Sequence, residues 1–211
     1  MIAHRTMTHL AATVLFNAVF VAFAAAAVGC GGGNDSTTSS APVAKFTPDT
    51  PAPAAGTIAL LSGSSSGASI NVRVTVTGVN DFFGAAFRIK YDVTALQFNA
   101  MSSTDSFLRG DPPNPDDPNV YFAADASHPG EIWISATRLD PTAGTVDVVS
   151  TSDLVVLNFT ARKAIAAGAA AGRVVFGALN REVQTCDGTV VPTVCSALAA
   201  IWSGGGVSAQ Q

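Results

Sequence analysis

The chain has 211 residues and a formal net charge of −4, and only 12% of its residues are charged. Its 11 Lys and Arg residues are scattered along the sequence, which excludes nucleic acid as a partner, because phosphate binding needs concentrated cations. Small and β-branched residues dominate the composition and favour short strands separated by turns over a helical bundle.

Residues 1–29 have the order of an export signal peptide. Arg5 comes near the start, the stretch from Leu10 to Val28 is almost wholly apolar, and small residues precede Cys30. This ending resembles the lipobox of bacterial lipoproteins, in which the cysteine thiol receives a diacylglyceryl group and becomes the new N-terminus. The resemblance implies lipidation of Cys30 and a lipid membrane as a partner. An uncleaved transmembrane anchor is the alternative, because an apolar stretch of this length also spans a bilayer.

Residues 30–55 are expected to form a flexible tether. Gly, Asn, Asp, Ser and Thr fill residues 31–40, a composition that cannot build a packed core. The stretch after Val28 lacks the Lys/Arg cluster of a stop-transfer sequence. We therefore expect an exported protein that is lipid-anchored to the cell envelope. Gly31, rather than Asp, follows the cysteine, and this resembles the sequence of Gram-negative lipoproteins that are sorted to the outer membrane.

The segment 56–208 repeatedly shows the period-two alternation of half-buried strands. Apolar and polar side chains alternate from Ile70 to Thr77 and again from Ala85 to Asp92. Shorter stretches continue the pattern at residues 96–98, 121–124, 132–136, 154–161 and 174–176, with turn-forming residues between them. About seven to nine such strands predict an all-β fold, an antiparallel two-sheet sandwich that is jelly-roll-like. Five side chains are expected between the two layers: Ile70, Val72, Phe87, Ile89 and Val156.

The two cysteines near the C-terminus are expected to form a disulfide. Setting aside the lipidated thiol leaves Cys186 and Cys195 as a pair. In an oxidising compartment their bond closes a ten-residue loop and contributes about 2.5 to 3 kcal/mol. A metal site is the weaker interpretation, because two cysteines without a neighbouring histidine leave the coordination sphere half empty.

The inventory for catalysis is poor. After the leader the chain has one histidine, His128, which lies in the turn-forming sequence Ser-His-Pro-Gly. The serines lie in low-complexity runs, and the one match to Gly-x-Ser-x-Gly, at residues 63–67, falls in such a run and is not a nucleophile elbow. Glu131 and Glu182 lie in ordinary strand contexts. We therefore expect no enzymatic activity.

One loop concentrates oxygen ligands of the kind that suits Ca²⁺. These ligands are Asp111, Asn114, Asp116, Asp117 and Asn119. Their spacing fits no known calcium loop, and the four prolines among them favour a rigid, solvated insertion between strands. We expect no cofactor, with calcium in this loop as the alternative.

Trp133 and Trp202 are the candidates for a binding surface. If Ile132 and Ile134 face the core, Trp133 points outward, where an indole serves sugar stacking or a protein hot spot. The alternative is that the opposite face is covered and the indole is packed.

Five stretches, in the same order, resemble strands of the cohesin domain, the receptor module of cellulosome scaffoldins. The strand Ala68–Val79 is followed by Gly84–Asp92 and Leu96–Phe98, which is similar to the cohesin order of a glycine, alternating apolar residues, Tyr-Asp and a Leu-x-Phe strand. Leu154–Ala161 and Arg173–Gly177 resemble two later cohesin strands. The resemblance covers residues 56–208 and implies that Phe87, Tyr91 and Phe98 belong to the core.

This resemblance implies that the domain binds a protein without covalent attachment. The partner is then a dockerin-like module or an envelope component, with a link to polysaccharide degradation. Cohesins use one sheet face whose residues vary by type, so no contact residue is carried over. A carbohydrate-binding module of the cell envelope, with polysaccharide as its ligand, is the alternative and predicts a row of exposed aromatic side chains.

Overall fold

The computed structural model describes residues 42–211 apart from 111, 142–143 and 188–193. The predicted signal peptide (1–29), Cys30 and residues 31–41 of the predicted tether therefore lie outside the described residues. Within the described part, the strands form one sheet of eight, one of five and one of two, named here sheets A, B and C. No helix among the described residues is both long and apolar enough to cross a bilayer.

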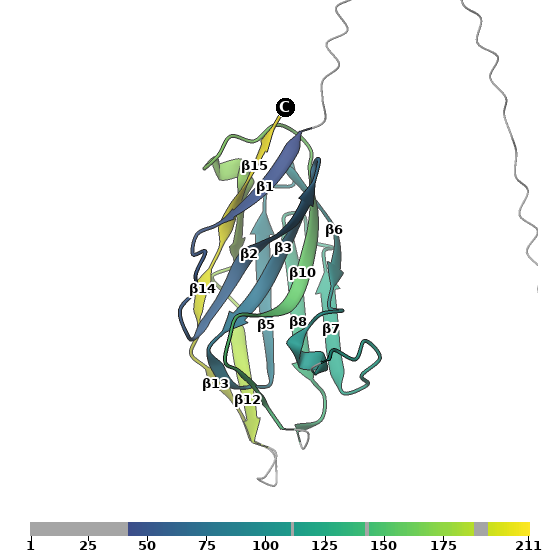
Figure 1. The fold of residues 1–211 in the computed structure, drawn as a ribbon, viewed down its shortest axis with the longest axis vertical. Coiled ribbons are helices and arrows are strands. Elements are labelled where there is room, and N and C mark those ends of the chain that lie inside the picture. The colour runs from purple at the N-terminus through teal and green to yellow at the C-terminus, as the bar shows by residue number, and fades with distance from the viewer. Residues whose placement is uncertain (1–41, 111, 142–143, 188–193) are drawn as a thin grey trace, which may run out of the picture. The chain divides into compact units, whose positions relative to one another are not determined.

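Sheet B forms one layer of the fold, in front of β5 and β8 in Figure 1. Its strand order is β14-β2-β3-β10-β6, in which β14 runs parallel to β2 and the other neighbours are antiparallel. The strands are β2 (Thr57–Ser66), β3 (Ser69–Thr77), β6 (Leu96–Ser102), β10 (Ser152–Ala161) and β14 (Ile201–Ser203).

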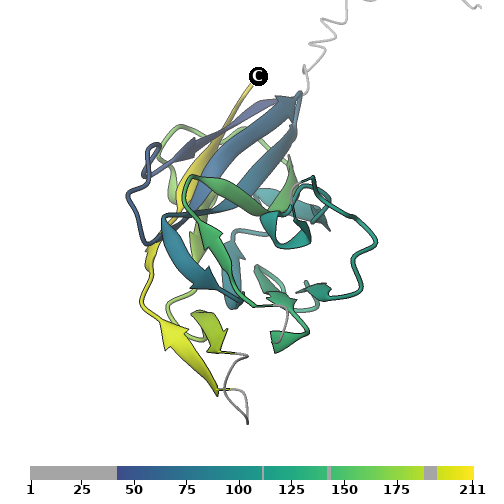
Figure 2. The same ribbon diagram turned by 60° about the horizontal axis from the view of Figure 1, so that its bottom comes forward.

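Sheet A forms the other layer, with the order β1-β15-β11-β5-β12-β13, and β8 pairs with both β5 and β7. Its strands are β1 (Val43–Pro48), β5 (Gly84–Tyr91), β7 (Val120–Asp125), β8 (Glu131–Arg138), β11 (Arg173–Phe176), β12 (Glu182–Asp187), β13 (Val194–Leu198) and β15 (Gly205–Gln210). Figure 2 shows the β12–β13 hairpin projecting from the body of the sandwich. Sheet C joins β4 (Val79–Phe82) to β9 (Val146–Val148).

The predicted two-sheet sandwich is confirmed, and its core lies where the alternation placed it. Ile70 and Val72 of β3 and Phe87 and Ile89 of β5 are at most 2% exposed. Phe159 of β10 contacts the rings of both Tyr91 and Phe98 edge-on, with centroids 5.4 and 5.7 Å away. Tyr91 and Phe98 are partly buried against this core, so the core role implied for them holds.

Val156 is a correction to the predicted core. The β10–β3 register shifts between Asp153 and Val155, so Leu154 and Val155 are both buried and the following residue turns outward. Val156 is partly exposed on the outer face of sheet B, opposite Arg73. A bulge reverses the alternation beyond it, and the apolar run Leu154–Leu157 hides this in the sequence.

The predicted boundary between tether and domain also needs correction. Residues 43–48 of the predicted tether 30–55 form strand β1, and Ala44 and Phe46 are 1% and 2% exposed. The strand pairs with β15 from Val43 opposite Gln210 to Pro48 opposite Gly205. The domain therefore begins before residue 56 and extends past 208. Only two inward side chains mark this strand, which is too short an alternation to stand out beside the Pro/Ala segment.

Candidate functional site

The outer face of sheet A is built from three neighbouring strands, β5, β8 and β7. Their apolar residues alternate inward, so every second side chain points away from the core. Arg88 lies opposite Trp133 in the β5–β8 register, and Trp133 lies opposite Asp125 in the β8–β7 register. Trp133 therefore sits in the middle of this face, as the alternation around Ile132 and Ile134 predicted.

Trp133 is 38% exposed and is held by three neighbours. The His128 ring stacks on the indole with centroids 4.9 Å apart and an interplanar angle of 8°. The Arg88 guanidinium carbon lies 3.8 Å from the indole centroid, a cation–π geometry. The indole Nε1–H donates to Oε2 of Glu131 at 3.2 Å. We call Arg88, His128, Glu131 and Trp133 the Trp133 cluster.

Glu131 connects the cluster to the cations of β5. Its carboxylate lies 3.0 Å from the Nζ of Lys90 and 3.7 Å from the Nη1 of Arg88. The hydrogen bond from Lys90, followed by that from Trp133, holds the pKa of Glu131 below its ordinary value. The cluster is therefore an oriented unit and not a freely rotating indole.

A cavity of about 320 Å³ opens beside the indole. Its walls include four small side chains, Ala86, Ala123, Ala124 and Ser135. Small residues leave room for a side chain of a partner to lie against the indole edge. The face therefore presents a rigid indole next to a cavity that can receive a side chain of a partner.

Trp202, the second indole predicted for the binding surface, is packed at the sandwich edge. It is partly buried, and its ring centroid lies 4.9 Å from that of Phe176 and 5.8 Å from that of Phe87. The Arg181 guanidinium lies over it at 5.7 Å. The ring is therefore part of the core boundary, which corrects its assignment to an open surface.

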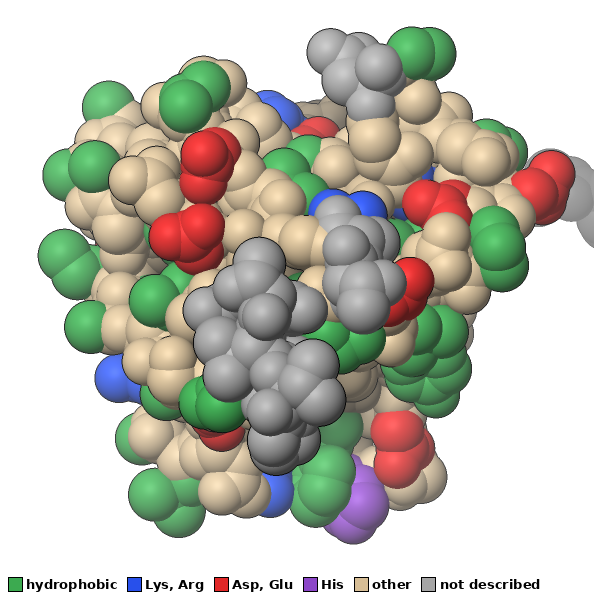
Figure 3. Space-filling view, turned by 90° about the horizontal axis from the view of Figure 1, so that it is seen from below, with side chains coloured by type: hydrophobic (Ala, Val, Ile, Leu, Met, Phe, Trp, Pro, Cys, Tyr) green, Lys and Arg blue, Asp and Glu red, His purple; other side chains and the backbone are tan. Residues whose placement is uncertain are grey.

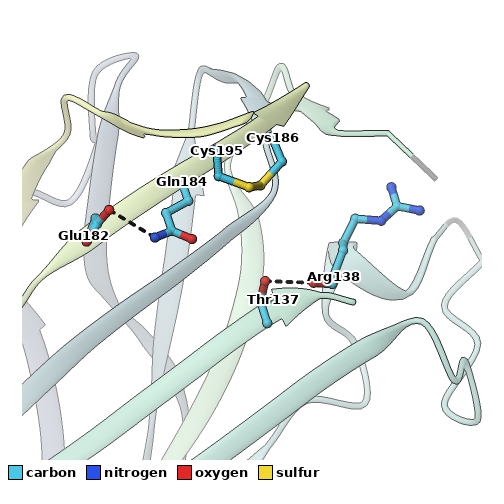
Figure 4. The surroundings of a disulfide bond; sticks show 6 residues. All are labelled: Thr137, Arg138, Glu182, Gln184, Cys186 and Cys195. Atoms are coloured by element: carbon cyan, nitrogen blue, oxygen red, sulfur yellow. Dashed lines mark hydrogen bonds between the residues drawn. A yellow bond between two sulfur atoms is a disulfide. The ribbon is translucent and has the colours of Figure 1, made fainter. Parts of the chain in front are cut away.

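The structure contains the predicted disulfide between Cys186 and Cys195. The two cysteines lie directly opposite each other in the β12–β13 ladder, so the bond clamps this hairpin. Figure 4 shows Glu182 and Gln184 on the same strand as Cys186, while Arg138 extends away from the bond.

Two of the predicted calcium ligands, Asn114 and Asp117, are arranged as turn-capping groups. Asp111 lies outside the described residues. Asn114 Oδ1 accepts from the backbone N–H of Asp116, and Asp117 Oδ1 accepts from that of Asn119. The Arg109 guanidinium donates to the carbonyls of Asn114 and Pro115. Because a fixed cation already binds the loop carbonyls, this geometry favours the solvated insertion over a calcium loop.

The charged members of the cluster were not among the predicted site residues. Arg88 and Glu131 lie on different strands, and only the β5–β8 register brings them to one indole. His128 was predicted as an exposed loop residue, and it is exposed, yet it stacks on Trp133. The opposite charges of Lys90 and Glu131 on neighbouring strands were the one signal in the sequence for this cluster, but recognising the pair requires knowledge of the strand register.

Across the described residues, no three His, Cys, Asp or Glu side chains are grouped to hold a metal.

Fold and surface together define a β-sandwich binding module. The cohesin domain family matches residues 55–190, more than half of the chain, and the chain therefore belongs to the cohesin domain family. Cohesin domains are non-catalytic modules that bind other proteins. No curated protein matches the chain.

Several solved cohesin structures are similar to this chain. CaCohA2 from Clostridium acetobutylicum is 20% identical, covers 77% of this chain and 88% of its own, and gives a TM-score of 0.47. The seventh ScaB type I cohesin from Pseudobacteroides cellulosolvens is 15% identical, with 66% and 81% covered and a TM-score of 0.47. The cohesin module of a Clostridium perfringens family 33 glycoside hydrolase is 14% identical, with 82% and 97% covered and a TM-score of 0.41.

Proposed function

We propose that the outer face of sheet A docks a dockerin-like protein module, with the Trp133 cluster at the centre of the interface. Membership of the cohesin family supports the class of partner. The observation that carries the position is the 38% exposed indole beside a cavity with small walls. A buried aromatic surrounded by small and polar contacts is the usual composition of an interface hot spot.

A protein fits this face better than a glycan does. Sugar stacking needs an open aromatic ring face, and both Arg88 and His128 lie against the indole ring of Trp133. Trp202 is packed against Phe176 and Phe87, so among the described residues the two tryptophans do not form an exposed row. An apolar partner side chain can contact the free indole edge without displacing either neighbour.

Binding of the full chain to a panel of purified dockerin modules, measured by biolayer interferometry, tests this proposal. At least one dockerin is expected to bind. Trp133→Ala is expected to weaken that binding by about 30-fold or more, which corresponds to a hot spot of about 2 kcal/mol. Ile201→Ala is the matched control, because Ile201 is 62% exposed on β14, away from the Trp133 cluster.

Two results would overturn the proposal. One is a panel in which no dockerin binds the folded full chain. The other is a dockerin whose affinity is lowered equally by Trp133→Ala and by Ile201→Ala, which would place the interface elsewhere.

The proposed setting of this module is the cell envelope. The export signal and Cys30 support attachment to a membrane by lipid, on the outer membrane if the cell is Gram-negative. A dockerin-bearing polysaccharide-degrading enzyme is the partner that the family suggests, and it would be held at the cell surface. The domain itself supplies binding and no catalysis.

A further inference from the structure

A second surface, separate from the Trp133 cluster, runs from the outer face of sheet B onto the neighbouring loops and the ends of β8 and β9. Two depressions of about 560 and 360 Å³ adjoin there, since Arg73 and Asp105 line both of them. The smaller crosses β3, β10 and β6, and the larger reaches the short 3₁₀ turn η1 (Phe107–Arg109), the coil at the lower right of Figure 1. We call the two depressions together the sheet B groove.

The bulge in β10 gives this groove an apolar floor. It turns Val156 outward, opposite Arg73 on one neighbouring strand and Ser102 on the other. Ala100 of β6, which is exposed, lines the same depression. These side chains offer C–H surface in the middle of polar walls.

A ladder of amide side chains lies along the smaller depression. Asn158 Nδ2 donates to Asn71 Oδ1 at 2.8 Å, and Asn99 Nδ2 donates to Asn158 Oδ1 at 2.7 Å. Asn71 Nδ2 in turn donates to the Ser64 hydroxyl at 2.8 Å. Asn158 Nδ2 also donates to the Ser69 hydroxyl, and Asn99 Nδ2 donates to the Thr160 hydroxyl. The ladder is therefore fixed, and its free capacity consists of amide oxygen lone pairs and one Nδ2 hydrogen of Asn71. The ladder is therefore pre-oriented for a polar ligand.

Charged groups with unused capacity line the larger depression. Arg73 holds Asp153 through Nε at 2.7 and 3.0 Å and through Nη2 at 2.7 Å, and its Nη1 has no hydrogen-bond partner among the described residues. Asp105 is exposed, and its carboxylate has no partner within that same part of the chain. Arg138 Nε is shut off from solvent and is likewise unpartnered among the described residues. Figure 3 shows acidic and basic side chains interspersed at this end of the molecule.

These features select a neutral ligand rich in hydroxyl groups. The larger depression is lined by two arginines against four aspartates, Asp105, Asp117, Asp147 and Asp153, which disfavours a polyanion. A sugar hydroxyl both donates and accepts, so it matches amides, carboxylates and guanidinium groups placed side by side. In the groove floor the β10 backbone is paired with both β3 and β6, so a ligand lying across it meets side chains and not free backbone groups. We propose that the sheet B groove binds a neutral glycan chain.

Affinity electrophoresis of the full chain in non-ionic detergent tests this proposal. The neutral probes are xyloglucan, galactomannan and hydroxyethyl cellulose, and polygalacturonate is the anionic probe. At least one neutral probe is expected to slow the wild type. Ala100→Arg fills the groove from an exposed position without removing a hydrogen bond, and it is expected to weaken retardation about tenfold or more. Ala52→Arg, in the exposed loop after β1, is the matched control and is expected to keep the wild-type value.

A second pair of variants tests the polar wall. Asp105→Ala removes an exposed groove carboxylate and is expected to weaken retardation several-fold, whereas Asp116→Ala, an exposed carboxylate that does not line the groove, is expected to leave it unchanged. The proposal is overturned if no neutral probe slows the wild type, if only polygalacturonate does, or if Ala100→Arg is slowed as strongly as wild type. Any of these failures leaves protein docking at the Trp133 cluster untouched, since the groove and the cavity beside Trp133 share no lining residue.

Discussion

Glu131 carries the acidic group on which the orientation of Trp133 depends. Its carboxylate accepts the indole N–H and lies 3.0 Å from the ammonium of Lys90. A carboxyl whose pKa is lowered in the folded state stabilises it above the unfolded pKa, and this contribution disappears as the pH falls through the folded pKa. The cluster is therefore expected to be intact at neutral pH and to loosen only in acid.

The first prediction follows from this ionisation. In an NMR titration, the side-chain carboxyl carbon resonance of Glu131 is expected to move with a midpoint below 4.5, the ordinary pKa of glutamate, because Lys90 and Trp133 both favour the charged form. Glu131→Gln is expected to remove this transition. A midpoint at or above 4.5 in the wild type would show that the lowered pKa is wrong.

The second prediction concerns the β10 bulge, which places two neighbouring valines in opposite surroundings. Val155 is 1% exposed, whereas Val156 is partly exposed on the outer face. Val155→Thr buries a hydroxyl and is expected to lower the free energy of unfolding by about 1–3 kcal/mol. Val156→Thr is expected to change it by less than about 0.5 kcal/mol. Urea denaturation measures both, and equal losses would contradict the observed register.

Strand β1 is the element that the sequence concealed most completely. It closes the edge of sheet A against β15, and Phe46 packs where Gly205 leaves room. A Cβ at Gly205 would lie 2.2 Å from the Phe46 ring, while a Cβ at Gly206 would meet its nearest atoms at 4.0 Å. The glycines of this C-terminal stretch thus serve different purposes, and only one makes space for the first strand.

The third prediction uses this pair of glycines. Gly205→Ala is expected to cost about 1–3 kcal/mol of unfolding free energy, because the Phe46 ring must shift within a packed core. Gly206→Ala is expected to be neutral or slightly stabilising, since it only restricts the unfolded chain. Thermal unfolding followed by circular dichroism distinguishes the two. A Gly205→Ala variant as stable as wild type would mean that β1 does not pack there.

At the scale of the whole molecule, the sandwich presents two outer faces of different chemistry. The sheet A face has an aromatic anchor beside a cavity with small walls, and the sheet B face has an amide ladder and mixed charges. Val43 pairs with Gln210, so the first and last strands of the domain lie side by side.

The fourth prediction concerns the attachment of the whole chain to a membrane. Expressed with its leader, the wild type is expected to enter the detergent phase of Triton X-114, because diacylation supplies two acyl chains for stable anchoring. Cys30→Ser is expected to lose lipidation, seen as the absence of the diacylglyceryl mass in the intact protein. Wild-type protein that carries no lipid yet stays in the detergent phase would support the uncleaved transmembrane alternative instead.

Sequence patterning predicted the β-sandwich and most of its central strands, because alternation over eight or nine residues, as in β3 and β5, is a local property of the chain. It also predicted the outward direction of Trp133 and the pairing of Cys186 with Cys195. It failed at β1, where only Ala44 and Phe46 point inward, and at the bulge that turns Val156 outward. Neither the first strand nor the bulge produces a pattern of neighbouring residues from which it could be predicted.

The sequence by itself determined which faces of the strands are apolar, and therefore that two sheets must close over one core. Only the tertiary structure decided which strands became neighbours. That pairing put Arg88, Glu131 and His128 around one indole, packed Trp202 against Phe87, and lined up the amides of three strands. The physical reason is that burial follows from local alternation, whereas surface chemistry depends on cross-strand register, which distant parts of the chain fix together.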